Sequence, residues 1–450
     1  MEVTGELARF IASTKYEDIP EIVIAEAKIC FLDWLSVTLA GVNDPMVESV
    51  IQTVELLGGT PQATVIGKGL RTSVVNAALA NGMSSHVLDF DDTSVDFLGH
   101  PSVTLFPSLL ALSEWQQKGG RDMLRAFVIG YEVGCRVALG ATPNHYLAGW
   151  HGTSTIGTFS SAAGSARLLG LGSQQIMFAL GVAGTQAAGL KAVFGTSCKP
   201  FHAGKASSNG LLAALLAQKG FTSINNILEG TQCFWEVFSK DPRPQDAIAD
   251  LGTKWHILNN KYKFHASCYG THAPIEAALK LKRDHAIDPD SIEKIDITVS
   301  RPMLQVAGKT KPEKALEGKF SIPYSVANAL LTEDTGINAF IDKKVNEPRV
   351  VSLRDRIALT PSDGLAPFES EVTIYSGKTH YKTKLNILEL VLGDELKKRD
   401  MLTKFRSLST PILGDARVQE IIKKVERLEE ERSMSDFVAL LTGRVQAHKG

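Results

Sequence analysis

The densest group of proton-transfer side chains lies between residues 86 and 101. It contains His86, Asp89, Asp91, Asp92 and His100. Carboxylates this close together repel one another, so they coexist only beside cations or hydrogen-bond donors, or with a raised pKa. Groups tuned in this way can act as general acids or bases near neutral pH. The alternative is an exposed aspartate that caps a helix, and the two nearby histidines favour the catalytic interpretation.

His100 is followed by Pro101. A residue before proline is held out of helical geometry, which suits a side chain presented from a rigid loop. Clustered aspartates and histidines can also hold magnesium or zinc. The spacing here matches no common metal-binding motif, so we predict no metal site.

Two further segments combine histidine with cations or aromatic rings. Residues 145–151 carry His145, Tyr146 and His151 between two predicted helices, where functional side chains are common, although one such histidine is more often structural. Residues 194–205 contain Lys199 and His202 in a glycine-containing turn before a helix predicted to begin at residue 204. Such a turn presents backbone N–H groups to an anion.

The 194–205 turn has neither the Walker pattern nor a dinucleotide fingerprint, so it fits a carboxylate better than a nucleotide. The alternative is an ordinary turn flanked by two solvated lysines, Lys199 and Lys205.

Two weaker candidates lie further along the chain. Residues 261–274 contain His265 and His272 at a predicted domain boundary, where small-molecule clefts are often found; the alternative is a polar junction. Tyr324 opens a predicted helix and is either a proton donor or an interface residue with a hydrogen-bonded hydroxyl.

Helical periodicity dominates the first two-thirds of the chain. It predicts helices at residues 22–39, 76–88, 107–117, 122–139, 153–169, 174–190 and 204–218. The last three are rich in Gly, Ala and Ser, so we expect closely packed helices there.

After about residue 268, alternating apolar residues predict strands. We expect them at 291–300, 350–359 and 371–383, with a hairpin turn at 376–378 and helices at 275–285 and 325–331. Helical patterns return at 418–432 and 434–441. We predict a mainly α fold, with an all-helical domain over 1–267 completed by 400–450 and an inserted, smaller α+β domain over 268–399.

The overall composition excludes several classes of protein. The 450 residues include 48 Lys and Arg against 49 Asp and Glu. The chain therefore lacks the positive net charge that would attract nucleic acid or an anionic membrane. The start lacks a signal-peptide pattern, no apolar stretch reads as a membrane span, and the five cysteines form no C-x-x-C motif. We therefore expect a cytoplasmic protein. Nothing in the sequence calls for a nicotinamide, flavin or other cofactor, so we predict none.

Taken in order, these motifs resemble the MmgE/PrpD family of carboxylate dehydratases, decarboxylases and epimerases. The motifs are Asp89-Phe-Asp-Asp-Thr93 with Gly-His100-Pro, His145-Tyr-x-x-Gly-Trp-His151, Lys199-Pro-x-His202-Ala-Gly, and Phe320-Ser-x-x-Tyr324. The resemblance implies a homodimer that acts on a small carboxylate in a cleft between the two domains. It implies a cofactor-independent lyase acting on a di- or tricarboxylate, or alternatively an epimerase of a substituted dicarboxylate such as iminodisuccinate.

The resemblance also implies roles for individual residues. The implied catalytic residues are Asp89, His100, His151, Lys199 and Tyr324, and the implied substrate-binding residues are Thr93, Tyr146, Lys199, His202 and His272. His265 stands near His272 as an alternative. In this hypothesis Lys199 and a histidine bind carboxylates, His100 or His151 moves the proton, and Asp89 orients that histidine.

Overall fold

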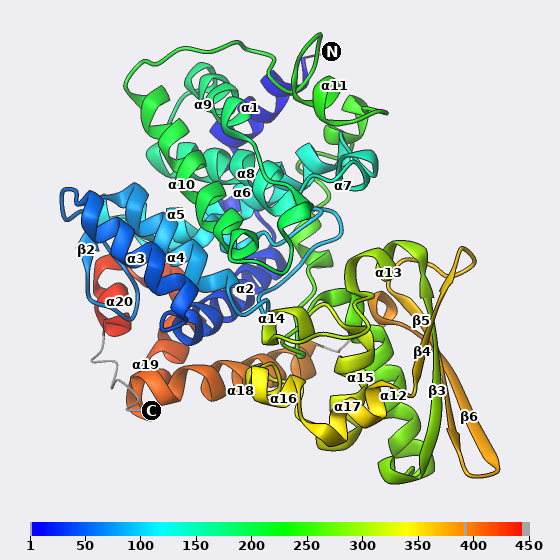
Figure 1. Cartoon of the computed structure of the whole chain (residues 1–450). Helices are drawn as coiled ribbons and strands as arrows, with labels where there is room; N and C mark the ends of the chain where they lie inside the picture. The colour runs from blue at the N-terminus through cyan, green and yellow to red at the C-terminus, as the bar shows by residue number, and fades with distance from the viewer. Residues whose placement is uncertain (1, 391–393, 443–450) are drawn as a thin grey trace. The chain divides into compact units, whose positions relative to one another are not determined.

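The computed structural model describes residues 2–390 and 394–442 of the chain (Figure 1). These residues fold into two compact units. The helical unit comprises Met1–Val87, Asp91–Tyr262 and Lys397–Gly450, and the mixed unit comprises Leu88–Phe90 and Lys263–Leu396. The fold is mainly α with a smaller α+β part, which confirms the predicted fold class. The domain ranges 1–267 with 400–450, and 268–399, stay a prediction.

The helical unit is built around α8 (Gly152–Leu169), whose side chains are almost all buried. This helix packs against α6 (Gly120–Leu139) and α10 (Cys198–Gln218), and α10 also packs against α4 (Val74–His86) (Figure 1). The remaining helices of the unit are α1 (Val3–Ser13), α2 (Glu21–Gly41), α3 (Pro45–Leu57), α5 (Ser102–Trp115), α7 (Asn144–Leu147), α9 (Ser173–Gln186), α11 (Phe234–Phe238), α18 (Asp394–Leu413, in this unit from Lys397), α19 (Asp415–Glu426) and α20 (Met434–Leu441).

Small residues allow α4 and α10 to cross closely. The composition of residues 204–218 predicted close packing for α10, whereas no such prediction was made for α4. A Cβ atom on Gly204 would lie 2.3 Å from the carbonyl oxygen of Leu79. One on Gly82 would lie 2.5 Å from the Cα atom of Gly204. Since real Cβ atoms do not approach backbone this closely, both positions require glycine.

Several predicted boundaries in the helical unit were wrong. Helix α10 begins at Cys198 rather than at residue 204, because Pro200 fits a first helical turn, where no backbone N–H is needed. Helix α5 begins at Ser102 and contains Pro107, whereas the predicted helix began at 107. Helix α9 ends at Gln186 instead of residue 190. A short hairpin of β1 (Ala63–Thr64) and β2 (Arg71–Thr72) was not predicted.

The mixed unit has a four-stranded sheet in the order β4-β3-β5-β6. Its strands are β3 (Ile292–Ser300), β4 (Ile357–Ser362), β5 (Glu369–Ser376) and β6 (Thr379–Asn386), with β3 and β4 parallel and the other pairs antiparallel. Helices α12 (His272–His285) and α15 (Ile322–Thr332) pack on the sheet (Figure 1). The unit also contains α13 (Arg301–Ala307), α14 (Ala315–Gly318), α16 (Asp342–Val345) and α17 (Pro348–Arg354).

The predicted hairpin is confirmed, since β5 and β6 are joined by Gly377 and Lys378, with Gly377 at φ 58°. The predicted strand over 350–359 was wrong in its first half. Pro348 begins α17 there, in agreement with the preference of proline for the first helical turn.

Within residues 2–390 and 394–442, no helix is both long enough and apolar enough to cross a membrane.

Candidate active site

Four helix ends bring polar side chains together in the helical unit. His86 is the last residue of α4. His100 lies just before α5, and His151 directly precedes α8. Lys199 and His202 lie in the first turns of α10. Three of these ends are helix N-termini, whose N–H groups and dipoles favour anions.

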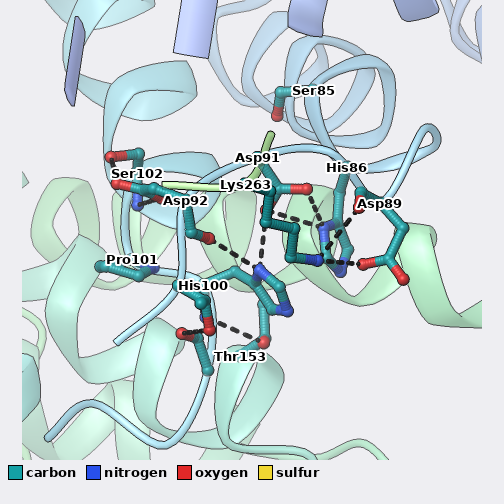
Figure 2. A network of polar contacts seen from close by, with 12 residues as sticks. Ser85, His86, Asp89, Asp91, Asp92, His100, Pro101, Ser102, Thr153 and Lys263 are labelled. Atoms are coloured by element: carbon teal, nitrogen blue, oxygen red, sulfur yellow. Dashed lines mark hydrogen bonds and ion pairs between the residues drawn. The ribbon is translucent and has the colours of Figure 1, made fainter. Parts of the chain in front are cut away.

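Close contact with α8 fixes the loop that carries His100. The backbone N–H of His100 donates to Oγ1 of Thr153, 3.2 Å away (Figure 2). A Cβ atom on Gly99 would lie 2.6 Å from the backbone nitrogen of Thr153. Gly99 therefore allows the loop to approach α8 closely, and the backbone of His100 is hydrogen-bonded to that helix.

Asp91 is the carboxylate that holds the imidazole rings in the helical unit. Its oxygens lie 2.9 and 3.0 Å from Nδ1 of His86, and Oδ2 lies 2.9 Å from Nδ1 of His100 (Figure 2). Burial alone would raise the pKa of Asp91. The two imidazoles outweigh that effect and keep the pKa of Asp91 well below its usual range.

The contacts of His100 define its tautomer. Nδ1 of His100 lies 2.9 Å from Oδ2 of Asp91 and 2.8 Å from the carbonyl oxygen of Asp92. Both neighbours accept hydrogen bonds only, so Nδ1 carries the proton and donates. In the neutral ring Nε2 is then the unprotonated nitrogen. An imidazole oriented by a carboxylate in this way is suited to take up and release a proton at Nε2.

His86 presents a second nitrogen that is ready to bind a ligand. Its Nε2 atom is buried and has no hydrogen-bond partner among the described residues. Burial lowers the pKa of His86 to about 3, even though Asp91 opposes the shift. His86 is therefore neutral at physiological pH, and its Nε2 can accept a hydrogen bond.

A second histidine pair lies beside the first. Nδ1 of His151 and Nδ1 of His202 are 2.9 Å apart, and the rings of His86 and His151 have centroids 6.3 Å apart. Burial lowers the pKa of both His151 and His202, that of His202 to about 4, and the positive charge of Lys199 lowers both further. Lys199 is only 4% exposed. A lysine charge among neutral imidazoles favours the binding of a carboxylate.

In the mixed unit, Asp89 forms an ion pair with Lys263. Nζ of Lys263 donates to Oδ1 of Asp89 at 2.8 Å and to its carbonyl oxygen at 3.0 Å (Figure 2). Both side chains are buried, and Asp89 has a φ of 51°, a conformation that aspartate tolerates better than most residues. Lys319 also donates to the carbonyl oxygen of Leu88. These lysines fix Leu88–Phe90 to the mixed unit.

The two candidate histidines of the mixed unit differ in whether a ring nitrogen is available to bind a ligand. Nδ1 and Nε2 of His265 contact Thr335 at 2.8 Å and Glu276 at 3.0 Å, so both nitrogens are used. His272 begins α12, and its buried Nε2 has no hydrogen-bond partner within the described ranges. This contrast favours His272 over His265 as a ligand-binding residue.

Two family models together match most of the chain. The model of the MmgE/PrpD N-terminal domain matches residues 5–247, and that of the C-terminal domain matches residues 265–430. The chain belongs to the MmgE/PrpD family. The predicted resemblance is therefore confirmed.

Several relatives align with this MmgE/PrpD chain over almost its whole length. A cis-aconitate decarboxylase-like protein of Aspergillus oryzae is 28% identical, covering 98% of each chain. A cis-aconitate decarboxylase of Aspergillus terreus is 26% identical over 99% of this chain and 97% of its own. The cis-aconitate decarboxylase of Homo sapiens is 28% identical over 98% of this chain and 95% of its own.

Other predicted site residues of this MmgE/PrpD protein make structural contacts. The hydroxyl of Tyr324 is buried and donates to the carbonyl oxygen of Ala339, and burial raises the pKa of Tyr324. Thr93 donates to the carbonyl oxygen of Gly99 at 3.2 Å. Tyr146 lies under Lys191, whose Nζ is 3.8 Å from its ring centroid. The catalytic or binding roles assigned to these three residues stay predictions.

The carboxylates and the lysines of the site occupy defined positions. Asp91 contacts Nδ1 of His100, and Asp89 pairs with Lys263 in the mixed unit. The expected role of Asp89 in orienting the proton-carrying histidine stays a prediction. Lys205 is exposed in the second turn of α10, as the alternative of a solvated lysine predicted, whereas Lys199 is buried. His86 and Asp91 both belong to the group of residues 86–101 in the sequence. Their separation of five residues was the one sequence feature that indicated a pair. Nothing in the sequence marked Lys263 as buried.

Proposed function

We propose that this chain is a lyase that removes carbon dioxide or water from a small di- or tricarboxylate by general acid–base catalysis. The observation that carries the proposal is the Asp91–His100 pair in the same cluster as the buried Lys199. The family membership and the decarboxylase relatives, which cover nearly the whole chain, support the reaction type.

In a decarboxylation, the bond from carbon to the departing carboxylate breaks and carbon dioxide leaves. The electron pair stays on the substrate, delocalised toward a remaining carboxylate, and a proton must then reach carbon. We assign that proton to Nε2 of His100, since Asp91 stabilises the charged ring. We assign the binding of the remaining carboxylate to Lys199, which stabilises the developing negative charge. In a dehydration, Nε2 of His100 would take a proton from carbon as the bond from carbon to the hydroxyl oxygen breaks. The same ring would then give that proton to the departing hydroxide, so that water leaves and the ring is neutral again.

Product analysis tests the reaction type. The purified protein would be incubated with cis-aconitate, citrate, methylcitrate and iminodisuccinate in deuterium oxide, and the products measured by mass spectrometry. Loss of carbon dioxide or water from one of them is expected. Deuterium incorporation without any other change in composition would instead indicate the epimerase alternative. Activity that disappeared on thorough chelation would contradict catalysis by side chains alone.

Two substitutions test the assigned residues. His100→Gln and Lys199→Met are each expected to lower kcat/KM by about 10²- to 10⁴-fold, the usual contribution of such groups. Lys205→Met and His285→Gln are matched controls, since both side chains are exposed, and they should keep wild-type activity. Full turnover by folded His100→Gln protein would remove His100 from the mechanism.

A further inference from the structure

A chain of buried contacts connects His100 to helix α18. Nζ of Lys404 lies 2.7 Å from Oδ1 of Asp33 on α2. Oδ2 of Asp33 accepts from the backbone N–H of Asp92 at 2.9 Å. The carbonyl oxygen of Asp92 in turn accepts from Nδ1 of His100 at 2.8 Å. Residues more than three hundred positions apart in the sequence are therefore linked through one peptide segment.

The side chain of Asp92 fixes that segment from the other side. Its Oδ2 accepts from Oγ of Ser102 at 2.6 Å and from Nδ2 of Asn260 at 2.8 Å. Asp33, Asp92 and Ser102 have no exposed surface, and Asn260 and Lys404 are 8% and 6% exposed. The loop before His100 is thus held between α2, the start of α5 and the segment around residue 260.

Lys404 supplies the positive charge that compensates the buried carboxylates of Asp33 and Asp92. The titratable groups near Asp92 are Asp33, Asp91, Cys30, Tyr131 and Tyr262, and Lys404 pairs with Asp33. Burial and the charge of Asp33 raise the pKa of Asp92 to about 7. Burial raises the pKa of Asp33 as well, and Lys404 opposes that shift. Removing Lys404 would leave two buried carboxylates facing each other, an arrangement that favours protonation or movement of the loop.

We propose that Lys404 and Asp33 are positioning residues, which keep an acceptor on the backbone N–H of Asp92 and so hold its carbonyl oxygen against Nδ1 of His100. Helix α18 thereby fixes the tautomer of the proton-carrying histidine without touching the substrate. The proposal rests on the function assigned to His100, but its first test needs no turnover.

Nitrogen NMR of the full-length protein with ¹⁵N-labelled histidine tests the proposal directly. In the wild type, the neutral ring of His100 is expected to show a protonated Nδ1 and an unprotonated Nε2. Lys404→Met should shift these signals toward a mixture of tautomers and lower turnover of cis-aconitate about 100-fold, the cost of a misplaced catalytic group. The signals that are absent from the spectrum of the His100→Gln protein are those of His100. A folded Lys404→Met protein with unchanged His100 signals would overturn the proposal.

Lys397→Met is the matched control. Lys397 lies on the same helix and pairs with Glu26 on α2 at 2.6 Å, so it also joins α18 to α2. Its loss should leave the His100 signals unchanged. An equal change in both variants would show a general loosening of α18 and would contradict the specific role of Lys404.

Two double variants decide the matter if Lys404→Met does not fold. Both Asp33→Asn/Lys404→Met and Asp33→Leu/Lys404→Met remove the buried charge pair, and such replacements are often tolerated. Only the first keeps an acceptor for the Asp92 N–H. The first should keep the wild-type His100 tautomer and the second should lose it, while the same tautomer in both would overturn the proposal. Absence of turnover in the wild type would refute the proposed function and leave this comparison intact.

Discussion

Asp91 and Asp92 are neighbours in the sequence, yet their carboxyl groups behave in opposite ways. Asp91 lies between two imidazoles, which keep its pKa well below the usual range. Asp92 is buried near Asp33, and its pKa is raised to about 7. The loop directs the carboxylate of Asp91 to the histidines, and that of Asp92 to Ser102 at the start of α5 and to Asn260. One loop thus provides both an ionised partner for the histidines and a fixed backbone carbonyl.

The residue-scale prediction concerns Asp91. Asp91→Asn offers only one acceptor oxygen to the two imidazole Nδ1 atoms, so at least one ring loses its orientation. We expect kcat to fall by about 10²- to 10⁴-fold, measured with the carboxylate that the product analysis identifies. Asp96→Asn is the control on the same loop, since Asp96 contacts His256 and Asn259 instead. Equal kcat values for the two variants would contradict the orienting role of Asp91.

At the scale of elements, the close crossing of α4 and α10 determines where the site groups lie. His86 ends α4, and Lys199 and His202 begin α10, so the distance between these groups depends on how the two helices pack. Gly204 permits that packing because it has no side chain at the crossing point.

Gly204→Ala should therefore disturb both stability and activity. The added methyl group meets the Leu79 carbonyl and forces the helices apart, and overpacking of this kind typically costs about 1–3 kcal/mol. We expect a lower thermal midpoint by calorimetry together with reduced turnover. Gly172→Ala is the control, because a Cβ atom there meets nothing within 4 Å and φ is −76°. If Gly204→Ala and the control have equal thermal midpoints, α4 and α10 adjust to the added methyl group without loss of stability, which would contradict the prediction.

At the scale of the whole molecule, buried neutral histidines link stability to pH. Burial lowers the pKa of His86 to about 3 and of His145 to about 4, and it lowers that of His151 well below its usual range. In the unfolded chain these groups titrate near pH 6.5. Below about pH 6.5 the unfolded state thus binds more protons than the folded state, so their contribution to stability is lost as the pH falls.

Asp92 acts in the opposite direction. Because its folded pKa is raised to about 7, the folded state holds a proton that the unfolded chain releases above about pH 4, and stability from this group falls as the pH rises. Burial also lowers the pKa of His202 and His272, and it raises that of Asp33. Five histidines against two aspartates leave a net loss of stability in acid. We expect the free energy of unfolding to fall by on the order of 5 kcal/mol between pH 6.5 and 5.

Urea unfolding across this pH range measures the effect. His151→Gln should make the pH dependence shallower, whereas substitution of the exposed His285 by Gln should leave it unchanged. A free energy of unfolding that stays constant from pH 6.5 to 5 would contradict the neutral state of the buried histidines.

The sequence by itself determined the family, the mainly α fold class and the motifs that contain most of the candidate site residues. It could do so because helical periodicity, the strand alternation of Ile295, Ile297 and Val299, and the ordered His, Asp and Lys motifs are all local patterns. Only the tertiary structure decided which groups act on one another. It paired Asp91 with His86 and His100, placed Asp89 with Lys263, and connected Lys404 to the loop of His100 through Asp33. These contacts depend on burial and on long-range packing, and neither leaves a periodic signal along the chain.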